Sequence, residues 1–219
     1  MTGVIFDMDG VLVASAAPHM RSWQILAQNY GLEISPETFR ATFGKTSRDI
    51  IREIWRPSTS EEDLRRLDRE KEAAYRELIT GCVPLMPGCR EVLQRLRAAG
   101  CGIAVATSGP PENLELVLSE GLIASCFDAE VHGFNIFRGK PAPDCFLLAA
   151  ERLGIPPSQC VVVEDAPVGI AAARAANMPA IALVGTHPRD VLAATSAACI
   201  VDSLGEITVE MVRGLLPAS

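Results

Sequence analysis

Four short apolar runs constrain the fold of this chain more than any other feature of its sequence. They lie at residues 4–6, 102–106, 161–163 and 180–184, and they are rich in β-branched residues. None of them alternates apolar with polar residues, as a strand with one face in water does. Such runs are typical of strands that are buried on both faces of a parallel sheet.

Helical patterns separate these runs and give the fold class. They cover residues 90–99, 112–120, 144–153 and 168–176, and a glycine directly follows the first three. Glycine commonly ends a helix because it adopts the left-handed conformation without strain. The alternation of strand and helix predicts an α/β fold with a Rossmann-like, doubly wound parallel sheet.

The segment between the first and second runs has a different character. It contains no strand-like run, and no glycine lies between Gly44 and Gly81. Its last part, residues 61–79, is densely charged but keeps Leu64, Leu67, Tyr75 and Leu78 near helical spacing, as an amphipathic surface helix does. The segment therefore reads as an all-helical insertion.

The predicted insertion divides the chain into two domains. Pro84, Pro87 and Gly88 mark the return of the chain to the sheet. We expect an α/β core domain at residues 1–14 and 82–219 and a helical cap domain at residues 15–81. The two crossings between them would form a hinge.

Composition excludes several classes of protein. With 219 residues, 48% of them hydrophobic, the chain can bury a full globular core. Its formal net charge is −7 and it has no run of basic residues, so nucleic acid is not an expected partner. No stretch approaches the length of about 20 apolar residues that a membrane span requires. We expect no membrane association, a cytoplasmic location, and a monomer or small homo-oligomer.

The cysteines give no sign of a disulfide framework or a zinc site. There are seven, an odd number, and no two form a C-x-x-C pair. The three histidines are equally scattered. We expect the cysteines to be reduced thiols in the core.

Two carboxylates follow the first predicted strand, in the sequence Asp7-Met8-Asp9-Gly10. Ligands of open α/β sheets bind at the carboxyl ends of the strands. Paired acids there are compatible with a metal site, with a nucleophile and its acid/base partner, or with a solvated turn.

Polar residues also follow two of the other predicted strands. Thr107 and Ser108 come after the second run, and Glu164 and Asp165 come after the third. An acidic pair also suits an ordinary helix N-terminus, where the helix dipole favours it. Together, however, these hydroxyls and acids are what a phosphate and a magnesium ion need side by side.

Lys140 lies in a segment with two prolines, Gly139-Lys140-Pro141-Ala142-Pro143-Asp144. It reads either as an isolated surface lysine or as part of the site. A site with several acids that also binds a phosphate dianion requires a fixed cation in addition to a metal ion.

These four pieces, in this order, resemble the motifs of the haloacid dehalogenase superfamily. The resemblance is to its phosphatase and β-phosphoglucomutase-like branch, which has a helical cap inserted after the first strand, and it covers essentially the whole chain. The matching segments are Phe6-Asp7-Met8-Asp9-Gly10-Val11-Leu12, Ala106-Thr107-Ser108, Gly139-Lys140-Pro141-Ala142-Pro143-Asp144 and Val163-Glu164-Asp165-Ala166.

The resemblance implies a role for each catalytic residue. Asp7 would be the nucleophile that accepts the phosphoryl group, and Asp9 the general acid/base. Thr107 and Lys140 would hold the phosphoryl oxygens, with backbone amides near Ser108.

The resemblance also implies a magnesium site. Asp7, the backbone carbonyl of Asp9, and Asp165 would be ligands, with Glu164 joining them directly or through water. The cation would offset the repulsion between an anionic nucleophile and an anionic substrate.

The predicted cap carries further matches. Ser15, His19 and Trp23 lie where capped members have a hinge hydroxyl, a histidine and an aromatic residue, and Arg48 and Lys71 resemble cap cations that face the active site. For His19, an ordinary position on a helix remains an alternative.

The leading hypothesis is a magnesium-dependent phosphomonoester hydrolase that acts on a small phosphorylated metabolite, such as a sugar phosphate, through an aspartyl-phosphate intermediate. Ala14 and Ala17 replace acidic residues that relatives often carry, and this loss of polar groups favours hydrolysis over the alternative of a β-phosphoglucomutase-like mutase. A non-catalytic phosphate-binding protein is disfavoured because the catalytic set is intact.

Overall fold

The computed structural model of this chain describes residues 1–55 and 59–217. Within these residues the core is one sheet of six parallel strands in the spatial order β3-β2-β1-β4-β5-β6. The strands are β1 (Gly3–Phe6), β2 (Gly102–Ala106), β3 (Ala129–Val131), β4 (Cys160–Glu164), β5 (Ala180–Leu183) and β6 (Cys199–Val201). The predicted Rossmann-like, doubly wound fold is confirmed.

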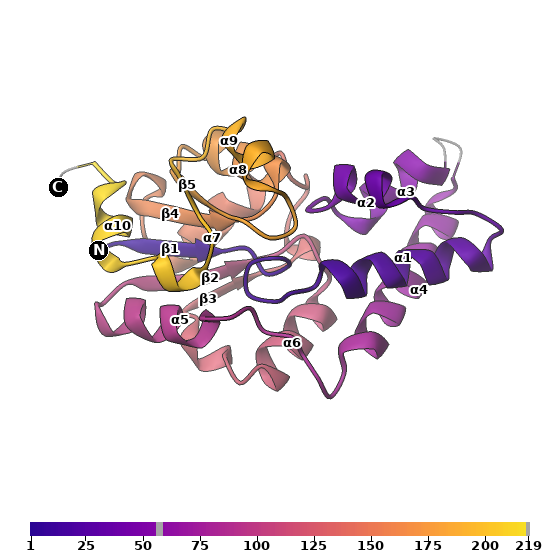
Figure 1. The fold of residues 1–219 in the computed structure, drawn as a ribbon, viewed down its shortest axis with the longest axis horizontal. Helices are drawn as coiled ribbons and strands as arrows, with labels where there is room; N and C mark the ends of the chain where they lie inside the picture. The colour runs from indigo at the N-terminus through magenta and orange to yellow at the C-terminus, as the bar shows by residue number, and fades with distance from the viewer. Residues whose placement is uncertain (56–58, 218–219) are drawn as a thin grey trace.

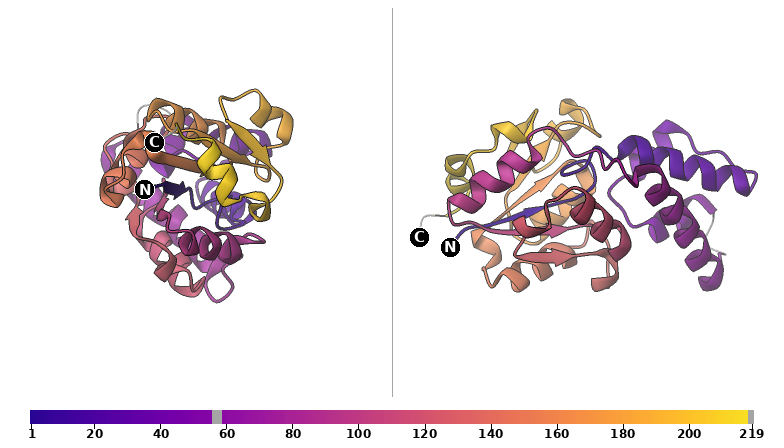
Figure 2. Two further views of the ribbon diagram at one scale, coloured as in Figure 1. Left: turned by 90° about the vertical axis from the view of Figure 1, so that its left-hand side faces the viewer. Right: turned by 90° about the horizontal axis from the view of Figure 1, so that it is seen from below.

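Two layers of helices cover the sheet, as Figures 1 and 2 show. The helices of the core are α5 (Cys89–Ala98), α6 (Pro111–Glu120), α7 (Asp144–Leu153), α8 (Pro167–Ala175), α9 (Arg189–Ala193) and α10 (Val209–Gly214). Short 3₁₀ helices add η1 (Ala124–Cys126), η2 (Gly133–Asn135), η3 (Pro157–Gln159) and η4 (Leu204–Glu206).

Alternate residues of each strand pack against different helices. Val4 and Phe6 of β1 lie in one apolar cluster with α5, α6 and α10, whereas Ile5 lies in another with α7, α8 and α9. Both faces of the sheet are therefore dry. This explains why the strands read as continuous apolar runs.

The inserted segment is all helical, as predicted, and lies beyond one end of the sheet (Figure 2). Its helices are α1 (Ala16–Asn29), α2 (Pro36–Thr42), α3 (Ser47–Trp55) and α4 (Glu61–Ile79). These helices have their own apolar cluster, which includes Trp23, Leu26, Phe39 and Leu64.

Helix α4 connects the cap to the core. Leu64 and Leu67 pack inside the cap, whereas Tyr75 and Ile79 belong to the apolar cluster of the sheet. The prediction for Leu78 was wrong, because this side chain is 39% exposed. The buried residue is instead Ile79, which lies on the same face of the helix as Tyr75 because it follows four positions later.

The two segments that link the cap to the core run side by side. Val13 and Leu85 form an antiparallel bridge, the Ala14 amide donates to the Pro84 carbonyl at 2.8 Å, and the Met86 amide donates to the Leu12 carbonyl at 2.8 Å. Both crossings therefore occur in one paired segment. The domain limits given above remain a prediction.

The sequence missed two strands, β3 and β6. Both have three residues and lie at the edges of the sheet, and β3 exposes Glu130 between two buried residues. Runs this short give too little periodicity to separate a strand from a loop.

The expectation that the cysteines are core thiols was wrong for Cys82, which is exposed, whereas Cys89, Cys101, Cys145 and Cys160 are buried.

In the described part of the chain, no helix has both the length and the apolar character to cross a membrane.

Gly169 of α8 is expected to be intolerant of any side chain. A Cβ there would lie 1.6 Å from the Glu164 carboxylate, which is itself fully buried. We predict that Gly169→Ala lowers the free energy of unfolding by about 2 kcal/mol, the usual cost of overpacking, as measured by urea denaturation. Gly214→Ala is the matched control, since Gly214 is also helical and has no atom within 4 Å of the added Cβ. Equal stabilities for the two variants would contradict this packing.

Candidate active site

The predicted polar residues meet at the carboxyl ends of three neighbouring strands. Phe6 pairs with Val105 of β2 on one side and Val163 of β4 on the other. Asp7 therefore follows β1 level with the ends of its neighbours, between Thr107 and Glu164. The strand order reverses between β1 and β4, the place where ligands bind to open sheets.

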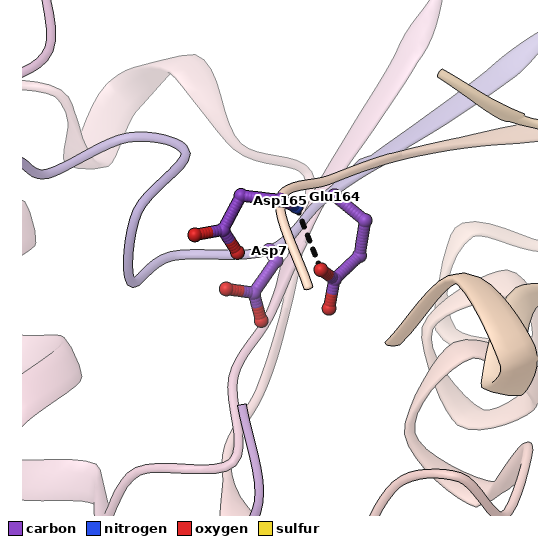
Figure 3. A group of neighbouring side chains, drawn as sticks. All are labelled: Asp7, Glu164 and Asp165. Carbon is purple, nitrogen blue, oxygen red and sulfur yellow. Dashed lines mark hydrogen bonds between the residues drawn. The ribbon is translucent and has the colours of Figure 1, made fainter. Parts of the chain in front are cut away.

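Three carboxylates form a compact buried group. Oxygen atoms of Asp7, Glu164 and Asp165 all lie within 4.8 Å of one another. Figure 3 shows them gathered at the ends of β1 and β4. Like charges this close in a low-dielectric interior repel strongly, so the group requires positive charge nearby.

Lys140 supplies part of that charge. Its Nζ donates to Asp7 Oδ1 at 2.5 Å and to Glu164 Oε1 at 2.7 Å, and the side chain is buried. Burial disfavours the charged amine, but Asp7 and Glu164 outweigh it and raise the pKa of Lys140. Lys140 is thus part of the site and not an isolated surface lysine.

The single positive charge of Lys140 does not neutralise the three carboxylates. Burial, opposed by Lys140 and reinforced by the nearby charges of Glu164 and Asp9, raises the pKa of Asp7 to about 8. Burial also raises the pKa of Asp165, and the charges of Glu164 and Asp7 add to this effect. Both shifts follow first from burial and then from repulsion among the neighbouring carboxylates, and Lys140 does not offset the two effects together.

The hydrogen bonding of these carboxylate oxygens suits a site for a hard divalent cation. Glu164 Oε2 accepts hydrogen bonds from the backbone amides of Asp165 and Ala166 at 2.7 and 2.6 Å. Among the described residues, no hydrogen bond reaches the buried Oδ2 of Asp165. Gly10 makes room for this oxygen, because a Cβ there would lie 1.9 Å away from it. A buried carboxylate oxygen without a donor, beside two further carboxylates, suits Mg²⁺.

Asp9 belongs to the same site but has different partners. Its carboxylate accepts from His19 Nε2 at 2.9 Å, from the Tyr75 hydroxyl at 3.3 Å and from the Thr107 hydroxyl at 3.4 Å. Burial raises the pKa of Asp9, but the interaction with His19, including its hydrogen bond from Nε2, outweighs burial, and the pKa falls to about 2. The side chain of Asp9 does not join the three-carboxylate group.

A chain of hydrogen bonds leads from Asp9 into the cap. Lys71 Nζ lies 2.8 Å from His19 Nδ1 and 2.9 Å from Glu72 Oε1. Since a lysine ammonium only donates, Nδ1 accepts and the proton of His19 lies on Nε2, facing Asp9. The His19 ring stacks on Tyr75 at 3.8 Å between centroids. His19 is therefore more than an ordinary helix position.

Sequence reasoning missed the residues that anchor this chain. Glu72, in the cap, also accepts from Ser47 and from Asn113 Nδ2 of the core at 2.6 Å. Asn113 Oδ1 in turn accepts from Arg76 at 2.8 Å, and Asn113 is fully buried. These polar residues fall outside the recognised motifs, and no spacing rule relates α4 to α6, so the sequence holds no signal for the pair.

The structure separates the remaining predicted cap residues. Lys71, His19 and Trp23 line the cavity that contains Asp7 and Asp9. Arg48 instead lines the neighbouring cavity, where its Nε donates to Asp68 at 2.9 Å. Ser108 lines both cavities, and its hydroxyl donates to the Gly44 carbonyl of the cap at 2.9 Å.

Comparison with known proteins identifies the family. The family model described as haloacid dehalogenase-like hydrolase matches residues 1–177. The chain belongs to this family, which confirms the resemblance of its motifs. Together with the sugar phosphatases among its relatives, this match also confirms the prediction of a phosphatase enzyme.

Named relatives lie on the phosphatase and phosphomutase branch. The chain is 35% identical over 179 residues to fructose-1-phosphate phosphatase YqaB of Escherichia coli, covering 82% of this chain and 94% of that protein. It is 35% identical over 214 residues to hexitol phosphatase A of the same organism, covering 94% and 93%. The crystal structure of β-phosphoglucomutase from Clostridium difficile superposes with a TM-score of 0.87 at 26% identity, covering 98% of this chain and 96% of that one.

Proposed function

We propose that this protein is a magnesium-dependent phosphomonoester hydrolase that acts on a small sugar phosphate or similar metabolite through an aspartyl-phosphate intermediate. The observation that carries the proposal is the position of Asp7 at the end of β1, bound by Lys140 and surrounded by further carboxylates. The phosphatases among the relatives support the substrate class.

Two displacements account for the reaction. In the first, an oxygen of Asp7 attacks phosphorus, the bond to the leaving oxygen breaks, and Asp9 gives that oxygen a proton. In the second, water attacks the aspartyl phosphate while Asp9 takes a proton from it, which releases phosphate and restores Asp7. Thr107 and Lys140 hold the phosphoryl oxygens.

Asp9 can change its protonation state between these steps. The free side chain is ionised because of His19, and this form serves as the base. A phosphoryl dianion beside it would raise its pKa and favour the acid form that the first step needs. The bonds from His19 and Tyr75 keep the carboxylate in place throughout.

Magnesium would be held by Asp7, Asp165 and the backbone carbonyl of Asp9, with Glu164 directly or through water. When bound, the ion supplies the positive charge that keeps the Asp7 carboxylate ionised and offsets its repulsion from the substrate. In this proposal residues 1–14 and 82–219 provide the chemistry, and the cap at residues 15–81 excludes bulk water and selects the substrate.

The first prediction concerns the nucleophile. Asp7→Asn replaces the attacking carboxylate by an amide, so we expect phosphate release to fall by at least about a thousandfold, measured on a substrate that the parent protein cleaves. Asp190→Asn, an exposed acid at the start of α9, is the control and should keep parental activity. Retained activity in Asp7→Asn would refute the assignment, and a parent that binds phosphate esters without cleaving any would favour a non-catalytic binding protein.

The second prediction concerns the metal ion. Chelation should abolish phosphate release, Mg²⁺ should restore it, and Ca²⁺ should support it poorly because its looser coordination misplaces the nucleophile. Mg²⁺ should also raise the melting temperature of the parent, and Asp165→Asn should remove most of that rise, since the variant loses a ligand. The Asp190→Asn control should retain the full rise. Parental activity in excess chelator would be incompatible with a metal-dependent reaction.

A mutase is the second candidate, favoured by the structural likeness to β-phosphoglucomutase. A mutase must hold a second phosphate while the first is on the nucleophile. We predict that β-glucose 1-phosphate with a trace of the 1,6-bisphosphate yields little glucose 6-phosphate, measured by a coupled assay, while a screen of monophosphates releases phosphate. Rapid formation of glucose 6-phosphate with negligible phosphate release would establish the mutase.

A further inference from the structure

A second cavity adjoins the one that contains Asp7. It lies between α3 of the cap and the loop that begins at Gly133 after β3, and the two cavities share Ser47, Glu72 and Ser108 as lining residues. A substrate whose phosphate reaches Asp7 can therefore extend into this second cavity. We call it the distal cavity.

The charges of the distal cavity are predominantly negative. Its lining includes four carboxylates but only two guanidinium groups. The acids are Asp49, Glu61, Asp68 and Glu72, and the bases are Arg48 and Arg52. An anion that enters therefore meets more negative than positive charge.

Both cations of the distal cavity are already paired. Arg48 Nε donates to Asp68 at 2.9 Å. Arg52 donates to Glu61 at 2.9 Å and lies 3.7 Å from Asp49. A second phosphate could reach only the remaining N–H groups of these guanidiniums, and there it would lie beside the carboxylates that already balance their charge.

The cations of the adjoining cavity are paired as well. Lys71 is bound by Glu72 at 2.9 Å, and Lys45 by Glu53 at 2.6 Å. Glu72 is buried, and the charge of Lys71 together with its hydrogen bonds overcomes that burial and lowers its pKa. Lys71 is therefore matched by a nearby fixed anion and is a weak site for a second phosphate.

The other groups of the distal cavity suit hydroxyls and a carbohydrate ring. Carboxylates and the hydroxyl of Ser47 accept hydrogen bonds from hydroxyl groups. The Phe134 ring is 55% exposed, with the Arg48 guanidinium 5.0 Å from its centroid. An aromatic face of this kind can pack against the C–H groups of a sugar or polyol.

We propose that the part of the substrate distal to its phosphate is an uncharged, hydroxyl-bearing chain or ring, and that Asp68 and Glu72 select against a second phosphate. This inference rests on the proposed function and narrows its substrate class. Like charges brought together across an interface cost enough free energy to exclude a wrong partner.

The test measures binding in a protein that cannot turn over. In Asp7→Asn protein with Mg²⁺, calorimetry compares fructose 1-phosphate with fructose 1,6-bisphosphate, and glucose 6-phosphate with glucose 1,6-bisphosphate. We expect the monophosphate of at least one pair to bind at least about tenfold more tightly, because the second phosphate of the bisphosphate brings a like charge beside Asp68 and Glu72. Equal or tighter binding of the bisphosphates, or no binding of any hexose monophosphate, overturns the inference.

Two charge-removing variants locate the selectivity. In the Asp7→Asn protein, the additional change Asp68→Asn should reduce the preference for the monophosphate by about fivefold. The change removes one negative charge from the cavity and leaves the Arg48 guanidinium without its carboxylate partner. Asp63→Asn is the matched control, since it makes the same change on α4 and removes the ion pair of Arg66, which lies outside the distal cavity. An equal loss of preference in both variants refutes the role of Asp68. Phosphate release by the parent tests the proposed function separately, because the binding comparison involves no turnover.

Discussion

The fold brings Asp7, Glu164 and Asp165 together where their mutual repulsion is strongest, in a buried space at the ends of two adjacent strands. Several nearby features reduce the cost of that arrangement. Lys140 bonds to two of the carboxylates, backbone amides bond to Glu164, and Gly10 leaves space for the third. The remaining excess of negative charge is what makes the site suitable for a divalent cation.

The cap completes this core and does more than cover it. Asp9 lies in the core segment that follows β1, two residues after Asp7, but its partners His19 and Tyr75 come from α1 and α4. Withdrawal of these helices would expose the carboxylate to water and remove the two groups that orient it. The acid/base function is therefore shared between two parts of the chain, which couples access of solvent to the state of Asp9.

The sequence predicted what short-range rules control. Buried strands read as apolar runs, and polar residues directly after them, such as Thr107 and Glu164, were placed at one edge because parallel strands end together. No such rule predicts contacts between residues on different helices that are far apart in the sequence. The pairing of Glu72 with Asn113 depends on how the cap sits on the sheet. The pairing of Arg48 with Asp68 depends on how α3 packs against α4 within the cap, and spacing along the chain encodes neither arrangement.

The paired linkers determine how the cap is attached. Because Val13 and Leu85 are bridged, and Ala14 is bonded to Pro84, the two connections behave as a narrow ribbon and not as two independent tethers. Neither linker can slide along its axis without carrying the other. Any movement of the cap relative to the sheet would have to bend that ribbon, so a substitution that stiffens it would restrict such a movement without touching any group in the site.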